Sequence, residues 1–200
     1  MSKDSTNTAY HAPANDALPR STRYGRAGLG FAAALALVSA MTLDGCGGGD
    51  MTQEATRTYA DRVVVRKSER KMQLLKNGQV LKEYRVALGD NPYGHKMWEG
   101  DERTPEGDYI LDWRNPLSNY HKAIHVSYPN ARDQEMAKAL GVSPGGMIMV
   151  HGLPNDLRSP RVRAEYARRD WTNGCIAVQD HEIDEIWRLV RDGTPIRIIQ

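Results

Sequence analysis

The stretch "DWTNGCIAV", residues 170–178, holds one of the two cysteines of this 200-residue chain. It ends in the short apolar run "CIAV", which is typical of a strand buried on both faces. Gly174 comes directly before Cys175, so the backbone can turn sharply where the strand begins. The stretch predicts a buried strand with a thiol at its start, and leaves open whether Cys175 is a core residue or a reactive group.

Short apolar runs separated by polar turns recur on the N-terminal side of this stretch. Residues 61–89 contain three such runs, and Asn77-Gly78, between the second and the third, is a strong hairpin signal. We therefore expect three consecutive antiparallel strands there. Further strands are expected at residues 109–113, 122–129, 147–152 and 194–199.

Helices are fewer than strands in this pattern. Residues 130–141 run from a polar start to a glycine and predict a short helix. Residues 180–192 predict a C-terminal helix that Asp180 caps. Its apolar face, at helical spacing, consists of Ile183, Ile186, Trp187 and Val190. The fold class expected is mainly β (α+β), a β-sandwich or barrel with peripheral helices.

The N-terminal 46 residues are typical of an export signal rather than of a folded domain. Residues 27–43 contain no charged side chain and follow a cationic segment that ends at Arg26. "LDGC", residues 43–46, resembles the lipobox of bacterial lipoproteins, in which the cysteine, here Cys46, receives the lipid. An uncleaved membrane anchor and a cleaved signal with an incidental Cys46 are the alternatives.

The expected organisation is a signal segment at residues 1–46, a Gly-rich flexible tether at 47–58 and a catalytic or binding domain at 59–200. We expect an exported, periplasmic lipoprotein that is anchored to the membrane. If Cys46 carries lipid, Cys175 has no disulfide partner. An unpaired thiol in an oxidising compartment is a liability unless it is deeply buried or chemically needed.

Composition argues against several classes of protein. The formal net charge is only +2, with no concentrated basic patch, which excludes a nucleic-acid surface. His121 and His125 are four residues apart, but in a strand that spacing is too wide for both to chelate one metal ion. We therefore expect no metal and no cofactor. We also expect a monomer.

The group that could activate the thiol is His151, which follows the apolar run "MIMV" and is itself followed by Gly152. A nearby imidazole favours the thiolate, and backbone N–H groups of Gly174 and Cys175 could hold the oxyanion of a tetrahedral intermediate. This pattern suggests acyl transfer through a thioester. The spacing alone is not diagnostic.

"MVHG" followed by "WTNGCIAV", with "GDERTPEGDYIL" upstream, resembles the signature of the L,D-transpeptidase catalytic (YkuD) domain. The resemblance covers about residues 60–200 and is greatest to the YafK-like murein transpeptidase subgroup. It implies an enzyme that acts on peptidoglycan stem peptides. Cys175 would attack a carbonyl of diaminopimelate, His151 would act as base with its ring oriented by the Gly152 carbonyl, and Thr172 would support the loop.

Two positions depart from the pattern of the family. Asn173 stands where many members have His, and Ala177 where many have Arg. The interval between the His-Gly pair and Thr172, residues 153–171, is also longer than usual and is rich in arginine. These arginines could bind stem-peptide carboxylates or form a solvated helical face. Asn173 and His125 are candidate substrate contacts, although His125 could equally be a hydrogen-bonded structural histidine.

These departures leave the reaction open among three alternatives. The first is transfer to an amine, which cross-links the cell wall. The second is hydrolysis, either as an L,D-carboxypeptidase or as an amidase that releases a peptidoglycan-linked lipoprotein. The third is a non-catalytic peptidoglycan-binding module.

Overall fold

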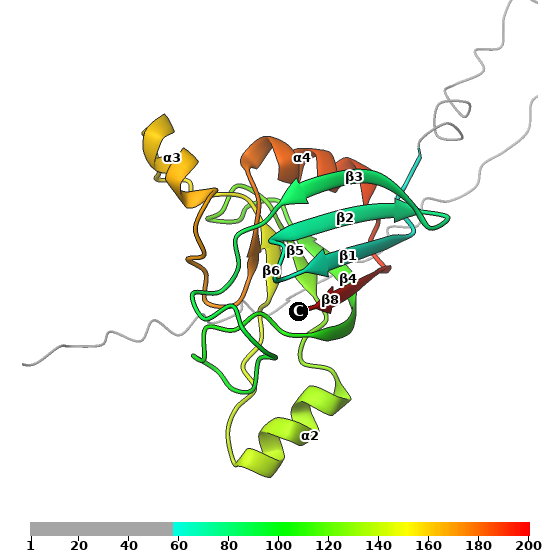
Figure 1. Cartoon of the computed structure of the whole chain (residues 1–200), viewed down its shortest axis with the longest axis vertical. Coiled ribbons are helices and arrows are strands. Elements are labelled where there is room, and N and C mark those ends of the chain that lie inside the picture. Colours follow the sequence, from blue (N-terminus) through cyan, green and yellow to red (C-terminus); the bar gives the residue numbers. More distant parts are fainter. Residues whose placement is uncertain (1–57) are drawn as a thin grey trace, which may run out of the picture. The chain divides into compact units, whose positions relative to one another are not determined.

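The computed structural model describes residues 58–200, which form one curled sheet of eight strands with three helices (Figure 1). The strands are β1 (Arg62–Arg66), β2 (Lys71–Lys76), β3 (Gln79–Arg85), β4 (Gly107–Asn115), β5 (Ala123–Val126), β6 (Met149–His151), β7 (Ile176–Ala177) and β8 (Thr194–Ile199). Their order across the sheet is β3-β2-β1-β8-β4-β5-β6-β7. The expected β-rich class with peripheral helices is confirmed. The predicted signal segment, Cys46 and most of the tether lie outside the described residues.

The first three strands form the antiparallel meander expected from the sequence. Asn77 and Gly78 connect β2 to β3 with φ of 51° and 76°. Two successive positive φ values are what a tight hairpin turn requires, and Asn and Gly are the residues that adopt them most readily. The local signal was therefore sufficient to place this hairpin.

β8 lies in the middle of the sheet. It pairs in parallel with β1 and antiparallel with β4, so it joins the β1–β3 meander to the β4–β7 half. Its side chains alternate between the core and the solvent: Ile196 and Ile198 are buried, whereas Arg197 is exposed. The strand nearest the C-terminus thus connects the two halves of the domain.

The sheet curls until its ends approach each other. Beyond β3, Ala87 forms an antiparallel bridge to Ala177 of β7, and Gly89 forms a parallel bridge to Thr172. The backbone bonds between Ala87 and Ala177 measure 2.8 Å in both directions. This closure gives the fold its barrel-like character and places residues 86–89 against the loop that carries Cys175.

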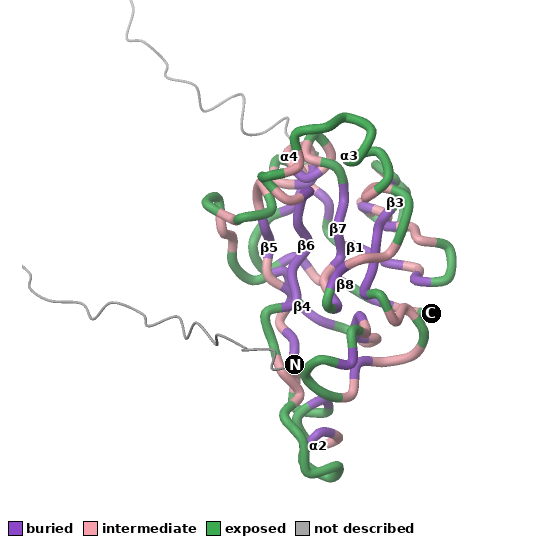
Figure 2. Tube along the Cα trace, turned by 90° about the vertical axis from the view of Figure 1, so that its left-hand side faces the viewer, coloured by how far each residue is buried: buried purple, intermediate pink, exposed green. Residues whose placement is uncertain are grey.

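The three helices differ in their contact with the core. They are α2 (Ala131–Leu140), α3 (Pro160–Tyr166) and α4 (Asp180–Leu189). In Figure 1, α2 and α3 project from opposite ends of the domain, and Figure 2 shows their largely exposed surface. α4 instead inserts Ile183 and Ile186 into the core beneath the sheet.

The boundaries of α4 correct the expectation of a helix over residues 180–192 capped by Asp180. The N-cap is Gln179, whose backbone N–H donates to Glu182 Oε2 at 2.8 Å. The Asp180 carboxylate instead accepts the Leu153 N–H at 2.9 Å. The helix ends at Leu189 because Val190 is extended (φ −108°, ψ 140°) and 1% exposed, turned into the core. In the described part of the chain, no helix has the length and apolar character needed to span a membrane.

Candidate active site

Neighbouring strands bring His151 and Cys175 to one face of the sheet. β6 and β7 are parallel, with Val150 opposite Ile176 and His151 opposite Ala177. Cys175 directly precedes β7, so by alternation it lies on the same face as Met149 and His151. The register of two short buried strands therefore positions the thiol and the imidazole together.

A cavity of about 260 Å³ opens over this face. Cys175 and His151 both line it, and the remaining lining residues come from the loop before β5, from β5, from the end of the loop before β6 and β6 itself, and from the segment before β7. These other residues are Ser118, Tyr120, Ala123, Met147, Met149, Trp171, Thr172 and Asn173. The site is mainly apolar with a few polar groups, as is usual where a ligand binds.

The His151 ring is fixed on its buried side. Its Nδ1 lies 2.7 Å from the Gly152 carbonyl oxygen, as the family resemblance implied. Since a carbonyl only accepts, the bond assigns the proton to Nδ1 and leaves the lone pair on Nε2. The side chain is 3% exposed, and this burial lowers its pKa to about 4 despite the opposing Gly152 bond. The imidazole is therefore neutral at neutral pH and able to accept a proton.

Gly152 is required at its position by close packing. A Cβ there would lie 2.8 Å from Asp180 Oδ1 and 3.0 Å from the Tyr120 carbonyl oxygen. Its N–H donates to Tyr120 O at 3.0 Å, and its carbonyl oxygen is bonded to His151 Nδ1. Both backbone polar groups of the residue are therefore held. The His151-Gly152 pair is thus anchored to the loop that contributes Tyr120 to the cavity.

The thiol of Cys175 bonds to the backbone of the strand beside it. The Met149 N–H donates to Sγ at 3.4 Å, and Sγ donates to the Met147 carbonyl oxygen at 3.6 Å. Burial raises the pKa of the thiol, although the Met149 N–H and the charge of Lys96 act in the opposite direction. The resting pair is therefore a neutral thiol beside a neutral imidazole, not the thiolate that a nearby imidazole led us to expect.

Thr172 holds the loop that leads into Cys175. Its hydroxyl donates to the Cys175 carbonyl oxygen at 2.8 Å and accepts the Gly174 N–H at 3.2 Å. Gly174 has φ of 118°, and a Cβ there would lie 2.6 Å from Arg103 O. Because the Gly174 N–H is already bonded, the expectation that it serves as an oxyanion donor needs correction, and the Cys175 N–H remains the candidate.

The two candidate substrate contacts differ in location. Asn173 is exposed and lines the cavity beside Cys175. His125 does not reach this cavity, although it shares the sheet face: its Nδ1 lies 2.7 Å from Asp112 Oδ1, and its ring stacks on Trp113 at 4.8 Å. The structure thus favours the hydrogen-bonded, structural interpretation of His125.

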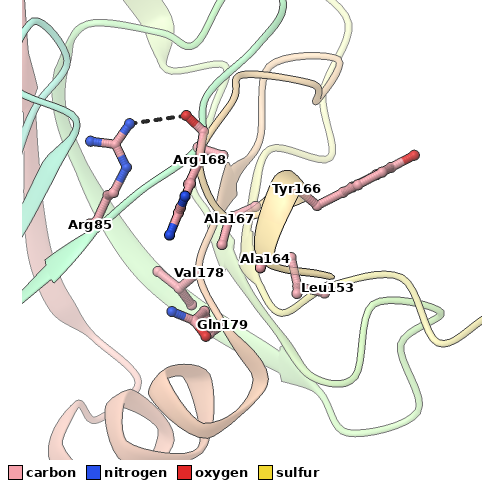
Figure 3. A pocket seen from close by; sticks show the side chains of 10 residues that line it. Arg85, Leu153, Ala164, Tyr166, Ala167, Arg168, Val178 and Gln179 are labelled. Carbon is pink, nitrogen blue, oxygen red and sulfur yellow. Dashed lines mark hydrogen bonds between the residues drawn. The ribbon is translucent and has the colours of Figure 1, made fainter. Parts of the chain in front are cut away.

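The arginine-rich interval forms an exposed helix away from the thiol. α3 has no buried residue, and none of its arginines lines the cavity that holds Cys175 and His151. Figure 3 shows a small hollow behind α3, of about 200 Å³, where Arg85 donates to the Arg168 carbonyl oxygen at 3.1 Å. Arg163 is bound to Asp180 at the start of α4. These contacts support the solvated-face interpretation over direct binding of substrate carboxylates in the cavity.

Sequence reasoning missed the aromatic residues of the site. The rings of Tyr120 and Trp171 lie 4.6 and 5.7 Å from that of His151, centroid to centroid. Trp171 is part of the stretch "DWTNGCIAV" itself, so its position next to the cysteine could have marked it. Tyr120 is 31 residues from His151 in sequence, and only the pairing of β5 with β6 brings the two together.

Comparisons with known proteins show the family to which this chain belongs. Residues 60–198 match the family model of the L,D-transpeptidase catalytic domain, YkuD. Two curated relatives are both named "Putative L,D-transpeptidase YafK" and come from Escherichia coli strains K12 and O157:H7. They are 30% identical over an alignment of 177 residues, gaps included, that covers 78% of this chain. This chain spans only 63% of their length.

A solved structure extends the comparison to three dimensions. The helical cell shape determining protein Pgp2 of Campylobacter jejuni is 25% identical, with a TM-score of 0.55. The match covers 72% of this chain and 48% of Pgp2. The fold seen here is therefore shared with a protein that determines cell shape.

Proposed function

Because this chain belongs to the L,D-transpeptidase catalytic domain family, we propose that it is a cysteine-dependent acyl transferase acting on peptidoglycan stem peptides. The observation that carries the proposal is the shared cavity of Cys175 and His151, with His151 Nδ1 bonded to Gly152. That bond leaves Nε2 as the proton acceptor. A nucleophile, a base and a group that orients the base form the arrangement needed for covalent acyl transfer.

The reaction starts from the neutral pair. Sγ attacks the carbonyl carbon at the L-centre of diaminopimelate while His151 Nε2 takes the thiol proton. The Cys175 N–H donates to the oxyanion of the tetrahedral intermediate. When the intermediate collapses, the C–N bond breaks, the imidazolium gives its proton to the departing D-amino acid, and a thioester to Cys175 remains.

The second half of the reaction depends on the acceptor. An amine of a second stem peptide loses its proton to His151 and attacks the thioester, which forms a cross-link and returns the proton to Cys175. Water in the same role gives hydrolysis, which is the alternative for this domain. Asn173 would contact the acceptor, which its exposed position at the rim beside Cys175 supports.

The location of the protein is part of the same proposal. Stem peptides lie outside the cytoplasm, and the apolar segment at residues 27–43 followed by Cys46 supports export and lipid anchoring. A monomer tethered through residues 47–58 would reach the cell wall from the membrane. Similarity to Pgp2 supports a role in wall remodelling and cell shape.

Incubation with a purified disaccharide tetrapeptide, followed by mass analysis, tests the function. A covalent adduct on the intact protein, absent from Cys175→Ala, is expected, with cross-linked dimers or trimmed tripeptides as products. Dimers identify a transferase and tripeptides a hydrolase. A carbapenem provides a second acylating probe, and a protein that forms an adduct with neither compound would be a non-catalytic binding module.

A further inference from the structure

A second cavity, of about 510 Å³, lies next to the catalytic one. Its walls are residues 119–120 before β5, residues 154–157 after β6, Tyr166 of α3, and Trp171. The volume falls within the range of small-molecule sites. The proposed reaction uses none of the residues that lie in this cavity alone.

The two cavities share a wall. Tyr120 and Trp171 line both of them. Ring centroids are 5.2 Å apart between Tyr166 and Trp171, and 5.9 Å apart between Trp171 and Tyr120. A continuous series of aromatic rings therefore leads from α3 to His151. A molecule that occupies both cavities has its reacting end at the thiol and its other end near α3.

The loop that forms one side of the second cavity is fixed by Asn155. Its Oδ1 accepts the His121 N–H at 2.8 Å, and its Nδ2 donates to the Ser118 carbonyl oxygen at 2.9 Å. The Asn155 N–H also donates to Asn119 O at 3.0 Å. The segments on either side of the cavity are thus bonded to each other, which makes this a preformed site.

The chemistry of the lining suits an uncharged polyhydroxylated ring. Tyr120, Tyr166 and Trp171 supply aromatic rings, whose π-systems are electron-rich and attract C–H groups. Asn119 and Asp156, both exposed, can bond hydroxyl and amide groups. No Lys or Arg side chain is among the lining residues, so the cavity is not built for an anion. A pyranose ring, with apolar C–H faces and a polar rim, matches this set.

We propose that the second cavity binds a hexosamine ring of the glycan strand to which the stem peptide is attached. The inference rests on the proposed function, because it is the stem peptide in the catalytic cavity that brings the sugar to this position. Three extended residues of a stem peptide, from the sugar to the reacting carbonyl, span about 10 Å. Such a peptide can reach from one of these adjoining cavities to the other. The domain would then recognise its peptide as part of the wall polymer and discriminate against free peptides.

Single-turnover acylation of Cys175 by two donors, a disaccharide tetrapeptide and the free tetrapeptide, tests this inference. For the unmodified protein we expect the second-order rate constant of acylation to be about tenfold higher with the disaccharide, the effect of one good aromatic contact. Tyr166→Ala should remove this preference while leaving the rate with free peptide unchanged. Tyr166→Phe, which keeps the ring, should retain it, and Asp156→Ala should reduce it.

Three results would overturn the inference. One is equal rates with the two donors for the unmodified protein. Another is a preference that survives both Tyr166→Ala and Asp156→Ala. The third is an equal loss of rate on both donors in Tyr166→Ala, which would identify a structural role or a site for a second peptide.

A binding measurement separates this inference from the proposed function. Cys175→Ala, which cannot be acylated, is titrated with a chito-oligosaccharide while tryptophan fluorescence is followed. Saturable binding that Tyr166→Ala abolishes in the same background is expected. If the unmodified protein forms no acyl-enzyme but Cys175→Ala binds the sugar, the catalytic proposal fails and the sugar site stands. If acylation is normal but Cys175→Ala binds no sugar, the sugar site fails and the catalytic proposal stands.

Discussion

The loop that carries Cys175 and the helix α3 are close in sequence but are held in very different ways. Thr172 and Gly174 are buried, and the loop forms backbone hydrogen bonds with residues 88–90. The carbonyl oxygen of Arg103 packs closely against Gly174. α3 has no buried residue, and its N-cap Ser159 makes no side-chain capping bond. Cys175 is therefore placed by buried backbone, whereas α3, which contributes Tyr166 to the second cavity, can vary with little cost to the fold.

The strongest test of the buried loop is Cys175→Ala. Acylation should fall by about 10⁴-fold or more, because the covalent intermediate cannot form. The melting temperature should change little, since the thiol makes only two long hydrogen bonds. Intact mass spectrometry and a thermal melt report the two effects. A large loss of stability with retained acylation would show that Cys175 is a core residue.

Gly174→Ala should break the loop itself. The positive φ and the 2.6 Å approach of a Cβ to Arg103 O predict a loss of about 2 kcal/mol or more in the free energy of unfolding. Gly193→Ala is the matched control, with φ of 90° but nothing within 4 Å of a Cβ, and should cost about 1 kcal/mol. Urea denaturation measures both. Equal losses would mean that the approach to Arg103 is relaxed in solution.

The pH profile of acylation tests the neutral pair within the rigid loop. The base is the unprotonated His151, which is lost as pH falls through its pKa of about 4. Acylation should persist far below the ordinary thiol pKa of about 8.5 and then decline by about tenfold per pH unit below pH 4. Stopped-flow acylation by a carbapenem gives this profile. A rate that rises with an ordinary thiol titration would exclude His151 as the base.

The smallest effect is expected on the α3 side. Arg163→Ala removes the ion pair with Asp180, in which the two side chains are 28% and 29% exposed. The loss in the free energy of unfolding should be less than about 1 kcal/mol. Acylation by a carbapenem should change less than about twofold. Urea denaturation and acylation rates check both values. A large loss of acylation rate would show that the position of Cys175 depends on the Arg163–Asp180 contact.

Local chemistry made part of this molecule predictable. Asn77-Gly78 placed a hairpin, and Asn130 and Gly141 delimited a helix that the structure confirms. His151 and Cys175 followed from their glycine neighbours and the family signature. In each case the information lies within a few residues, because turns, caps and motifs depend on local backbone geometry.

Other features depend on residues far apart and could not be predicted. The parallel pairing of β1 with β8 joins Val63 to Ile196, and no local pattern encodes that register. Tyr120 approaches His151 only once β5 and β6 pair. The early end of α4 follows from the burial of Val190, which its helical spacing concealed.

The central position of β8 has a consequence for when the surroundings of Cys175 can assemble. Residues 194–199 separate the half of the sheet that begins at β1 from the half that carries His151 and Cys175. Until that segment has been synthesised and has inserted between β1 and β4, the bridges from residues 87 and 89 to the cysteine loop have no continuous sheet to close. During synthesis, the growing chain therefore carries Cys175 without an assembled cavity around it until β8 has been added and has paired.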